Sequence, residues 1–190
     1  MIARFLGLGL WALSAVAAAA GPSPAERVEA FHGALQAMME EAEFTAREAA
    51  IQPHIPQFFD VETIARLSLG AGTWNGLDAE QKAHFVALQQ ALIAATYAQR
   101  FNGGGGPRFR VLETRQLRSG EVVRCQVLPR DGDAVSLDYA FKGDRVINVL
   151  ADGVSDLSLR RTDYARVLAA AGFDGLLTEL DGKIASARND

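Results

Sequence analysis

The sequence of 190 residues contains a single cysteine, Cys125, and three histidines. One thiol cannot form a disulfide within the chain, and a free cysteine usually serves as a small buried apolar side chain. His32, His54 and His84 lie far apart in the sequence, and no C-x-x-C or H-E-x-x-H motif is present. The sequence therefore predicts no internal disulfide, no metal site and no cofactor.

A long apolar run occurs at the start of the chain. A single basic residue, Arg4, precedes an almost unbroken apolar stretch from Phe5 to Ala20. The stretch is shorter than the about 20 residues that a membrane-spanning helix needs, and its end in Ala18-Ala19-Ala20 is typical of a signal peptidase site. Residues 1–20 are therefore predicted to be a cleaved signal peptide that exports the protein to the periplasm, with a retained anchor as the alternative.

Basic residues are outnumbered by acidic ones, 19 against 23, which gives the chain a net charge of −4. Arg4 belongs to the predicted leader, so the remaining chain is more acidic still. This balance argues against nucleic acid as a partner. The length from residue 21 to residue 190 allows one substantial core, and a single domain is expected there.

Helical periodicity dominates the chain from Ser23 to Phe101. Ser23–Glu26 forms a capping-box pattern with proline at the first helical position, which predicts a helix that continues to about Phe44. Leu77–Gln81 repeats the capping signature and starts the longest predicted helix, whose wide apolar stripe indicates contact with two surfaces. Between these helices the sequence predicts a helical extension at residues 45–52, an extended connection at Phe58-Phe59, a helix at residues 61–69 and a loop at residues 71–76.

The hydrophobic period changes to two between Arg108 and Leu150. Tight-turn sequences separate the alternating segments at Ser119-Gly120, Asp131-Gly132 and Gly143-Asp144. The pattern predicts a curved four-stranded antiparallel meander with one apolar face, and the long helix is its expected partner. The fold class is therefore α+β, with N-terminal and C-terminal helices packed on one face of the meander.

The last predicted strand leads into a turn and then into a helix. Val146–Leu150 is followed by Asp152–Ser155, and an amphipathic helix is predicted to begin near Leu159 and to end at Gly172. Asp174 then caps a final helix. The sequence thus predicts that the C-terminal helices close against the rest of the chain at this junction.

The order of these segments resembles the MlaC family, the periplasmic phospholipid carriers also described as toluene-tolerance auxiliary proteins of an ABC transport system. The resemblance covers most of the chain after the leader. It rests on Leu69-Gly70 with Trp74 shortly after, the segment Gln81–Tyr97, the Gly153-Val154-Ser155 junction with Tyr164 on the following helix, and Gly172–Leu176.

Two segments depart from the phospholipid carriers: a short hairpin without tryptophan at Lys142–Arg145, and Ser155–Arg161 after the junction. The second is similar to the HpnM branch of the same superfamily, which accompanies hopanoid biosynthesis. The resemblance therefore leaves the lipid open between a phospholipid and a hopanoid-type lipid.

The resemblance implies a lipid carrier without enzymatic activity. Residues 21–190 would form a monomeric lipid-binding domain whose helices and sheet enclose an apolar pocket. The protein would pass its lipid between an inner-membrane ABC transporter complex and an outer-membrane lipoprotein complex and so support outer-membrane lipid asymmetry. The expected pocket residues are Leu88, Leu92, Ala95, Tyr97, Val123, Val127, Leu137, Tyr139, Phe141, Val149 and Val154.

Small residues along the long helix, among them Ala91, Ala94 and Ala95, leave room between that helix and the sheet. A dry core in which the two surfaces fill the space is the alternative. If the helix lines a pocket, a tryptophan at Ala95 is expected to exclude lipid and to spare the fold.

Two other functions fit parts of the pattern. An enzyme could use Tyr97, Tyr139 or Asp138 for proton transfer, but Asp138 alternates with Tyr139 and is expected to point away from the apolar face. An accessory subunit could dock through Arg160–Asp163, although such a charged run is more often a solvated helix face.

Overall fold

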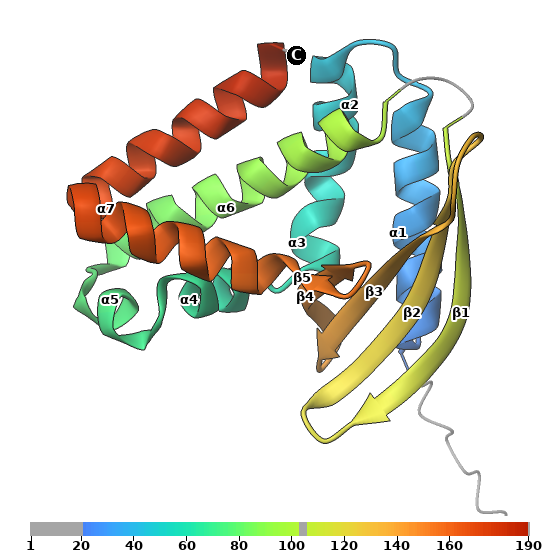
Figure 1. The fold of residues 1–190 in the computed structure, drawn as a ribbon, viewed down its shortest axis with the longest axis horizontal. Helices are drawn as coiled ribbons and strands as arrows, with labels where there is room; N and C mark the ends of the chain where they lie inside the picture. Colours follow the sequence, from blue (N-terminus) through green and yellow to red (C-terminus); the bar gives the residue numbers. More distant parts are fainter. Residues whose placement is uncertain (1–20, 103–105, 190) are drawn as a thin grey trace, which may run out of the picture.

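The computed structural model describes residues 21–102 and 106–189 (Figure 1). The predicted signal peptide therefore lies outside the described residues, and so do Gly103, Gly104 and Gly105. Helices occupy the first half of the described chain, an antiparallel sheet follows, and a long kinked helix completes it. The α+β class predicted from the sequence is confirmed.

Two capping boxes start the principal N-terminal helices, as predicted. Ser23 and Glu26 exchange hydrogen bonds at the start of the first helix, and Asp78 and Gln81 do so at the start of the longest helix before Gly103. The helices of this region are α1 (Pro24–Met39), α2 (Phe44–Ile51), the short 3₁₀ helix η1 (Gln52–His54), α3 (Ile55–Phe58), α4 (Val61–Leu69), α5 (Ala71–Gly76) and α6 (Ala79–Arg100).

Two stretches predicted to be irregular are helical. Pro53 and Pro56 stand in the first turns of η1 and α3, where a missing N–H costs no hydrogen bond, so they begin helices there. Phe58 is consequently helical, and Phe59 is extended and bridges to Val146. The predicted loop at residues 71–76 is helix α5, separated from α4 by Gly70 at φ 78°.

The sheet is an antiparallel meander with one more strand than predicted. Its strands are β1 (Arg108–Leu117), β2 (Gly120–Leu128), β3 (Val135–Lys142), β4 (Arg145–Ala151) and β5 (Val154–Ser155), in the order β1-β2-β3-β4-β5. Asp152 and Gly153 both have positive φ, 48° and 79°, the geometry of a tight hairpin turn. The chain therefore folds back at once, and Val154 and Ser155 pair with β4.

The predicted alternation on β3 is confirmed, because Tyr139 and Phe141 are buried while Ser136 and Asp138 are half-buried. The expected partner of this apolar face was the long helix α6, but α6 reaches it only through its C-terminal half. Helix α1 lies along β1 and β2 (Figure 1), whereas α6 packs mainly against α7, α2 and α4. The wide apolar stripe of α6 thus contacts helices on two sides, and its C-terminal half also reaches the sheet.

Helix α7 (Asp156–Asn189) begins earlier than Leu159 and runs past Gly172, where φ 69° and ψ −169° bend it. Its second half returns toward α2 (Figure 1), and there Arg188 donates two hydrogen bonds of 2.9 Å to the Glu48 carboxylate. Two core clusters result. One joins the inner face of the sheet to α1, α3 and part of α6, and the other joins α4, α5, α6 and α7.

A buried arginine ties the α1–α2 connection to α6. Arg47, 8% exposed, donates from Nε to the Ala98 carbonyl at 2.9 Å and from Nη1 to the Glu41 and Ala42 carbonyls. Because Ala98 lies in the last turn of α6, the guanidinium satisfies a carbonyl that has no partner within the helix and also complements the helix dipole.

We expect Arg47→Met to lower the free energy of unfolding by about 2 kcal/mol, because it leaves the buried Ala98 carbonyl without a donor. Arg66→Met on the exposed side of α4 is the matched control and should change the free energy of unfolding by less than about 0.5 kcal/mol. Urea unfolding of both variants measures the difference. Equal stabilities would show that Arg47 does not hold this connection.

Candidate functional site

A cavity of about 190 Å³ lies between the end of the sheet, the C-terminal half of α6 and the first turns of α7. We call it the β4–α7 pocket. Most of its wall is apolar, and its polar and charged lining residues are Thr96, Arg100, Asn148, Asp156 and Arg160. The apolar lining residues, together with Tyr97, are Phe59, Ile64, Ile93, Phe101, Leu137, Ile147, Val149, Ala151, Val154, Leu157 and Leu159.

The sheet wall of the pocket depends on an irregularity in β4. Ala140 pairs with Asn148, but its neighbour Phe141 pairs with Val146, so Ile147 is an extra residue in the β3–β4 pairing. Ile147, Asn148 and Val149 then all line the pocket in succession, which a regular strand could not do.

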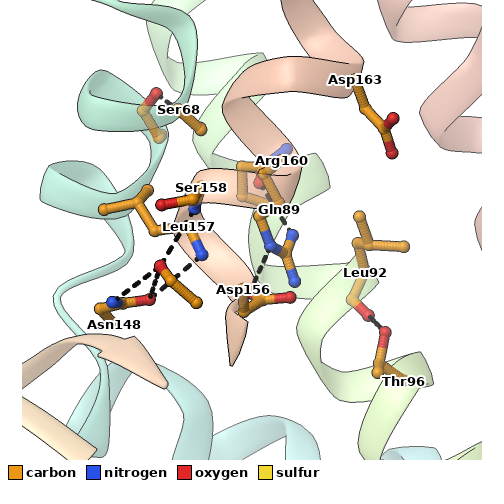
Figure 2. Close-up of polar contacts among 12 residues, drawn as sticks. Ser68, Gln89, Leu92, Thr96, Asn148, Asp156, Leu157, Ser158, Arg160 and Asp163 are labelled. Atoms are coloured by element: carbon orange, nitrogen blue, oxygen red, sulfur yellow. Dashed lines mark hydrogen bonds and ion pairs between the residues drawn. The ribbon is translucent and has the colours of Figure 1, made fainter. Parts of the chain in front are cut away.

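Asn148 fixes the start of α7 from the neighbouring strand. Its Oδ1 accepts a hydrogen bond of 3.1 Å from the Leu157 backbone N–H, and its side chain exchanges hydrogen bonds with the Ser155 hydroxyl. Ser155 Oγ in turn accepts from the Ser158 N–H at 3.1 Å, as an N-cap residue does (Figure 2). These bonds start α7 at Asp156, one turn before the predicted position.

We expect Asn148→Ala to lower the free energy of unfolding by about 1 to 2 kcal/mol, the usual cost of losing a helix cap. Ser158→Ala is the matched control, because Ser158 takes part in the described network through its backbone N–H and carbonyl. Thermal melts of the two variants give the comparison. A loss of equal size in both would contradict the role assigned to the Asn148 amide.

A buried polar cluster lies behind the pocket, between α6 and α7. Gln89, fully buried, accepts from Tyr164 Oη at 3.0 Å and from Arg160 Nη1 at 3.2 Å, and Arg160 Nε donates to Asp156 Oδ2 at 2.6 Å. Figure 2 shows the Arg160, Gln89 and Asp156 side chains converging there. Burial opposes the charge of Arg160, but Asp156 and Tyr164 raise the pKa of its guanidinium, so the pocket contains a permanent cation.

A second buried chain of polar groups reaches the pocket wall from the core. His32 Nε2 lies 3.1 Å from Tyr139 Oη, and the Tyr139 and Tyr97 hydroxyls interact with each other. Burial raises the pKa of both tyrosines above the usual value and lowers that of His32 to about 4. These groups are therefore neutral near pH 7, and Tyr97 presents its ring to the pocket while Phe31, Phe59 and Phe101 hold it.

The groups considered for proton transfer do not converge. The Asp138 carboxylate lies 3.5 Å from Arg124 Nε, whereas Tyr139, the next residue on β3, is fully buried on the inner face of the sheet. A carboxylate and a hydroxyl meeting in one pocket are what such chemistry requires. The arrangement of Tyr97, Tyr139 and Asp138 does not provide that pair.

The structure divides the predicted pocket residues between the β4–α7 pocket and other places. Tyr97, Leu137, Val149 and Val154 line the pocket. Val123, Tyr139 and Phe141 are buried in the core between the sheet and α1, and Val127 is buried on β2. Leu88 and Ala95 belong to the core cluster that includes α7, and Leu92 packs against it.

Sequence reasoning missed the polar side of the pocket. Arg160 was expected to lie on a solvated helix face, but its side chain is 12% exposed. Its partner Gln89 is 71 positions earlier, but Arg160 stands one turn before the buried Tyr164 on the same helix face, and that spacing was a local signal for an inward position. Arg100, Asn148 and Asp156 were also missed. The sequence did contain a signal for the start of α7, because Ser155 stands three residues before Ser158, the spacing of an N-cap. A helix that starts there brings Asp156 and Arg160 to the wall of the β4–α7 pocket.

Within residues 21–102 and 106–189, no helix is long and apolar enough to cross a membrane. The same residues bring no three metal-binding side chains of the His, Cys, Asp or Glu type together. Cys125 is buried, and burial raises the pKa of its thiol to about 12, which disfavours the reactive thiolate.

The fold and the pocket define a class: an α+β protein that leaves an apolar, partly charged cavity between a curved sheet and its helices. Residues 28–182 match the family model described as "MlaC protein", and this chain belongs to that family. The sequence matches no curated protein.

A solved structure shares this fold. It is the phospholipid-binding protein from Ralstonia solanacearum, determined in complex with a phospholipid. The similarity has a TM-score of 0.74 at 18% sequence identity and covers 87% of this chain and 99% of that one. At this identity the similarity concerns the fold.

Proposed function

We propose that this protein is a periplasmic lipid carrier that holds the acyl chains of its lipid in the β4–α7 pocket. Membership of the MlaC family and the phospholipid in the similar solved structure support this proposal. The observation that carries it is the pocket itself, where apolar side chains from β4, α6 and α7 surround a cavity. Burial of each methylene contributes about 0.8 kcal/mol, so acyl chains alone give substantial affinity.

The cavity of about 190 Å³ is smaller than the roughly 300–1,000 Å³ that ligand pockets commonly have. We therefore infer that its walls separate when lipid enters.

The family resemblance suggests where the lipid comes from and goes to. The protein would exchange a phospholipid or hopanoid-type lipid between an inner-membrane ABC transporter complex and an outer-membrane lipoprotein complex, acting as a monomer. It would bind the lipid without covalent chemistry, which agrees with the separation of Asp138 from the buried tyrosines.

Native mass spectrometry of the protein purified from its own envelope tests the proposal. We expect a protein mass increased by that of a bound lipid, and transfer of that lipid from donor to acceptor vesicles when the protein is added. Purified protein that is free of lipid and neither extracts nor transfers lipid from vesicles would contradict the carrier function.

Export is tested separately. If residues 1–20 are a cleaved leader, the intact mass of the exported protein corresponds to a chain that begins near Gly21, recovered in the periplasmic fraction. Recovery of the full-length chain in the membrane fraction alone would support a retained anchor instead.

A further inference from the structure

Strand β1 forms an open edge of the sheet. It pairs with β2, and within residues 21–102 and 106–189 no other strand pairs with it. Figure 1 shows β1 at the margin of the sheet opposite to β5 and α7. Every second residue of such a strand directs its backbone N–H and C=O groups away from the sheet, so a further extended segment can pair with them.

This edge strand is long and partly apolar. It has ten residues, whereas proteins often keep their edge strands very short. Leu112 is an extra residue in the pairing with β2 and divides β1 into two regular stretches, Arg108–Val111 and Glu113–Leu117. The side chains of Leu112 and Leu117 are 47% and 49% exposed.

The inner side of the first stretch is incompletely covered. Phe109 and Val111 pack against the core cluster but are only half-buried, and His32 of α1 stacks on Phe109. Because α1 packs against β1, an added strand with apolar side chains on this side would cover the exposed parts of both residues.

The outer side of the same stretch is basic. Residues 108–118 contain four arginines and a single glutamate, whereas the whole chain has a net charge of −4. Arg108 and Arg110 are exposed, and among the described residues neither forms an ion pair within 4.0 Å. The glutamate, Glu113, already pairs with two other arginines, at 2.7 and 3.0 Å. Arg108 and Arg110 are thus accessible to an acidic partner.

Charge decides which kind of segment fits this edge. A second copy that paired through its own β1 would bring two arginine-rich strands side by side, and like charges on adjacent strands repel each other. A segment with carboxylates on one face and apolar side chains on the other matches both sides of the Arg108–Val111 stretch, because opposite charges on neighbouring strands attract.

We propose that the β1 edge is a docking site at which an extended acidic segment of a partner protein adds as a further strand beside Arg108–Val111. Backbone hydrogen bonds hold the segment, Arg108 and Arg110 pair with its carboxylates, and its apolar side chains cover Phe109 and Val111. No residue of β1 lines the β4–α7 pocket, so docking here leaves the pocket wall untouched. The inference does not rest on the proposed carrier function.

The test uses a fluorescently labelled, end-capped peptide of eight residues that alternates glutamate and valine. Fluorescence anisotropy measures its affinity for the purified protein, and hydrogen exchange measures the protection of residues 108–112. We expect saturable binding and slower exchange in β1. A lysine–valine peptide should bind at least about tenfold more weakly. A glutamate–valine peptide with proline at two valine positions should also bind more weakly, because it lacks those backbone donors.

The double variant Arg108→Glu, Arg110→Glu should bind the glutamate–valine peptide at least about tenfold more weakly, because two attractive cross-strand pairs become repulsive. Arg66→Glu, Arg145→Glu is the matched control, since both arginines are exposed, lie outside β1 and form no ion pair among the described residues. It changes the net charge by the same amount and should bind the peptide as wild type does.

The peptide comparison uses wild type, so its result stands even if the β1 variant folds poorly. Binding of neither peptide would overturn the proposal and show that the arginines only keep the edge from pairing. Equal affinity for the glutamate and lysine peptides would overturn the acidic assignment, and unchanged exchange in β1 would overturn main-chain pairing. A dimer in sedimentation whose formation protects β1 from exchange would show that a second copy occupies the edge instead.

Discussion

Thr96→Trp should abolish lipid binding and leave the protein folded. Thr96 is half-buried, lines the β4–α7 pocket and uses its hydroxyl for the Leu92 carbonyl of its own helix, at 2.7 Å. An indole at this position would occupy the cavity in place of an acyl chain. We expect no lipid in native mass spectra of the purified variant, and a free energy of unfolding within about 1 kcal/mol of wild type, because the substitution creates no packing conflict in a dry core.

The neighbouring residue provides the control. Ala95 is fully buried among Phe85, Leu176 and Leu180 in the cluster between α6 and α7. Ala95→Trp should therefore destabilise the protein by about 3 kcal/mol or more through overpacking. The structure thus moves the pocket-filling test from Ala95, where the sequence suggested it, to Thr96. A folded Thr96→Trp variant that still carries its full complement of lipid would show that this cavity is not the binding site.

The alternation of β2 and β3 was enough to identify their buried face, since a period of two assigns every second side chain to one side of a sheet. It could not tell which buried residues face other side chains and which face a cavity. Tyr139 and Leu137 share one face of β3, but Tyr139 lies in the packed core and Leu137 lines the pocket. The difference depends on where α1 and α7 cover the sheet, which no strand pattern contains.

The position of the pocket was harder to predict because it depends on local exceptions to the periodic patterns. The extra residue Ile147 breaks the alternation of β4, and the positive φ of Asp152 allows β5 to form. The phase of α7 places Arg160, one turn before the buried Tyr164, toward α6 and Arg161 outward, but only the fold shows that Gln89 waits there as its partner. The bulge and the contact between Arg160 and Gln89 depend on segments far apart in the chain, which a single sequence does not bring together.

The protein should lose stability in acid through His32. His32 is 5% exposed, stacks on Phe109 with ring centroids 4.4 Å apart and contacts Tyr139. Burial lowers the pKa of its imidazole from 6.5 to about 4 in the folded protein. Above pH 6.5 the His32 imidazole is unprotonated in both the folded and the unfolded protein. Between pH 6.5 and pH 4 the unfolded chain takes up a proton and the folded protein does not, so stability falls by about 1.4 kcal/mol per pH unit, or roughly 3 kcal/mol in all.

His32→Gln isolates this contribution, because glutamine can still hydrogen-bond to Tyr139 Oη and does not titrate. His54 and His84 are exposed and present in both proteins, so their effects cancel. We expect the stability of wild type relative to His32→Gln, measured by urea unfolding, to be constant above pH 7 and to fall steadily by roughly 3 kcal/mol toward pH 4. Since Tyr139 interacts with Tyr97 in the pocket wall, protonation of His32 in the folded protein, which begins only near pH 4, should loosen that wall and weaken lipid retention in wild type alone. Parallel stability curves for the two proteins would show that His32 is already hydrated and free to accept a proton in the folded state.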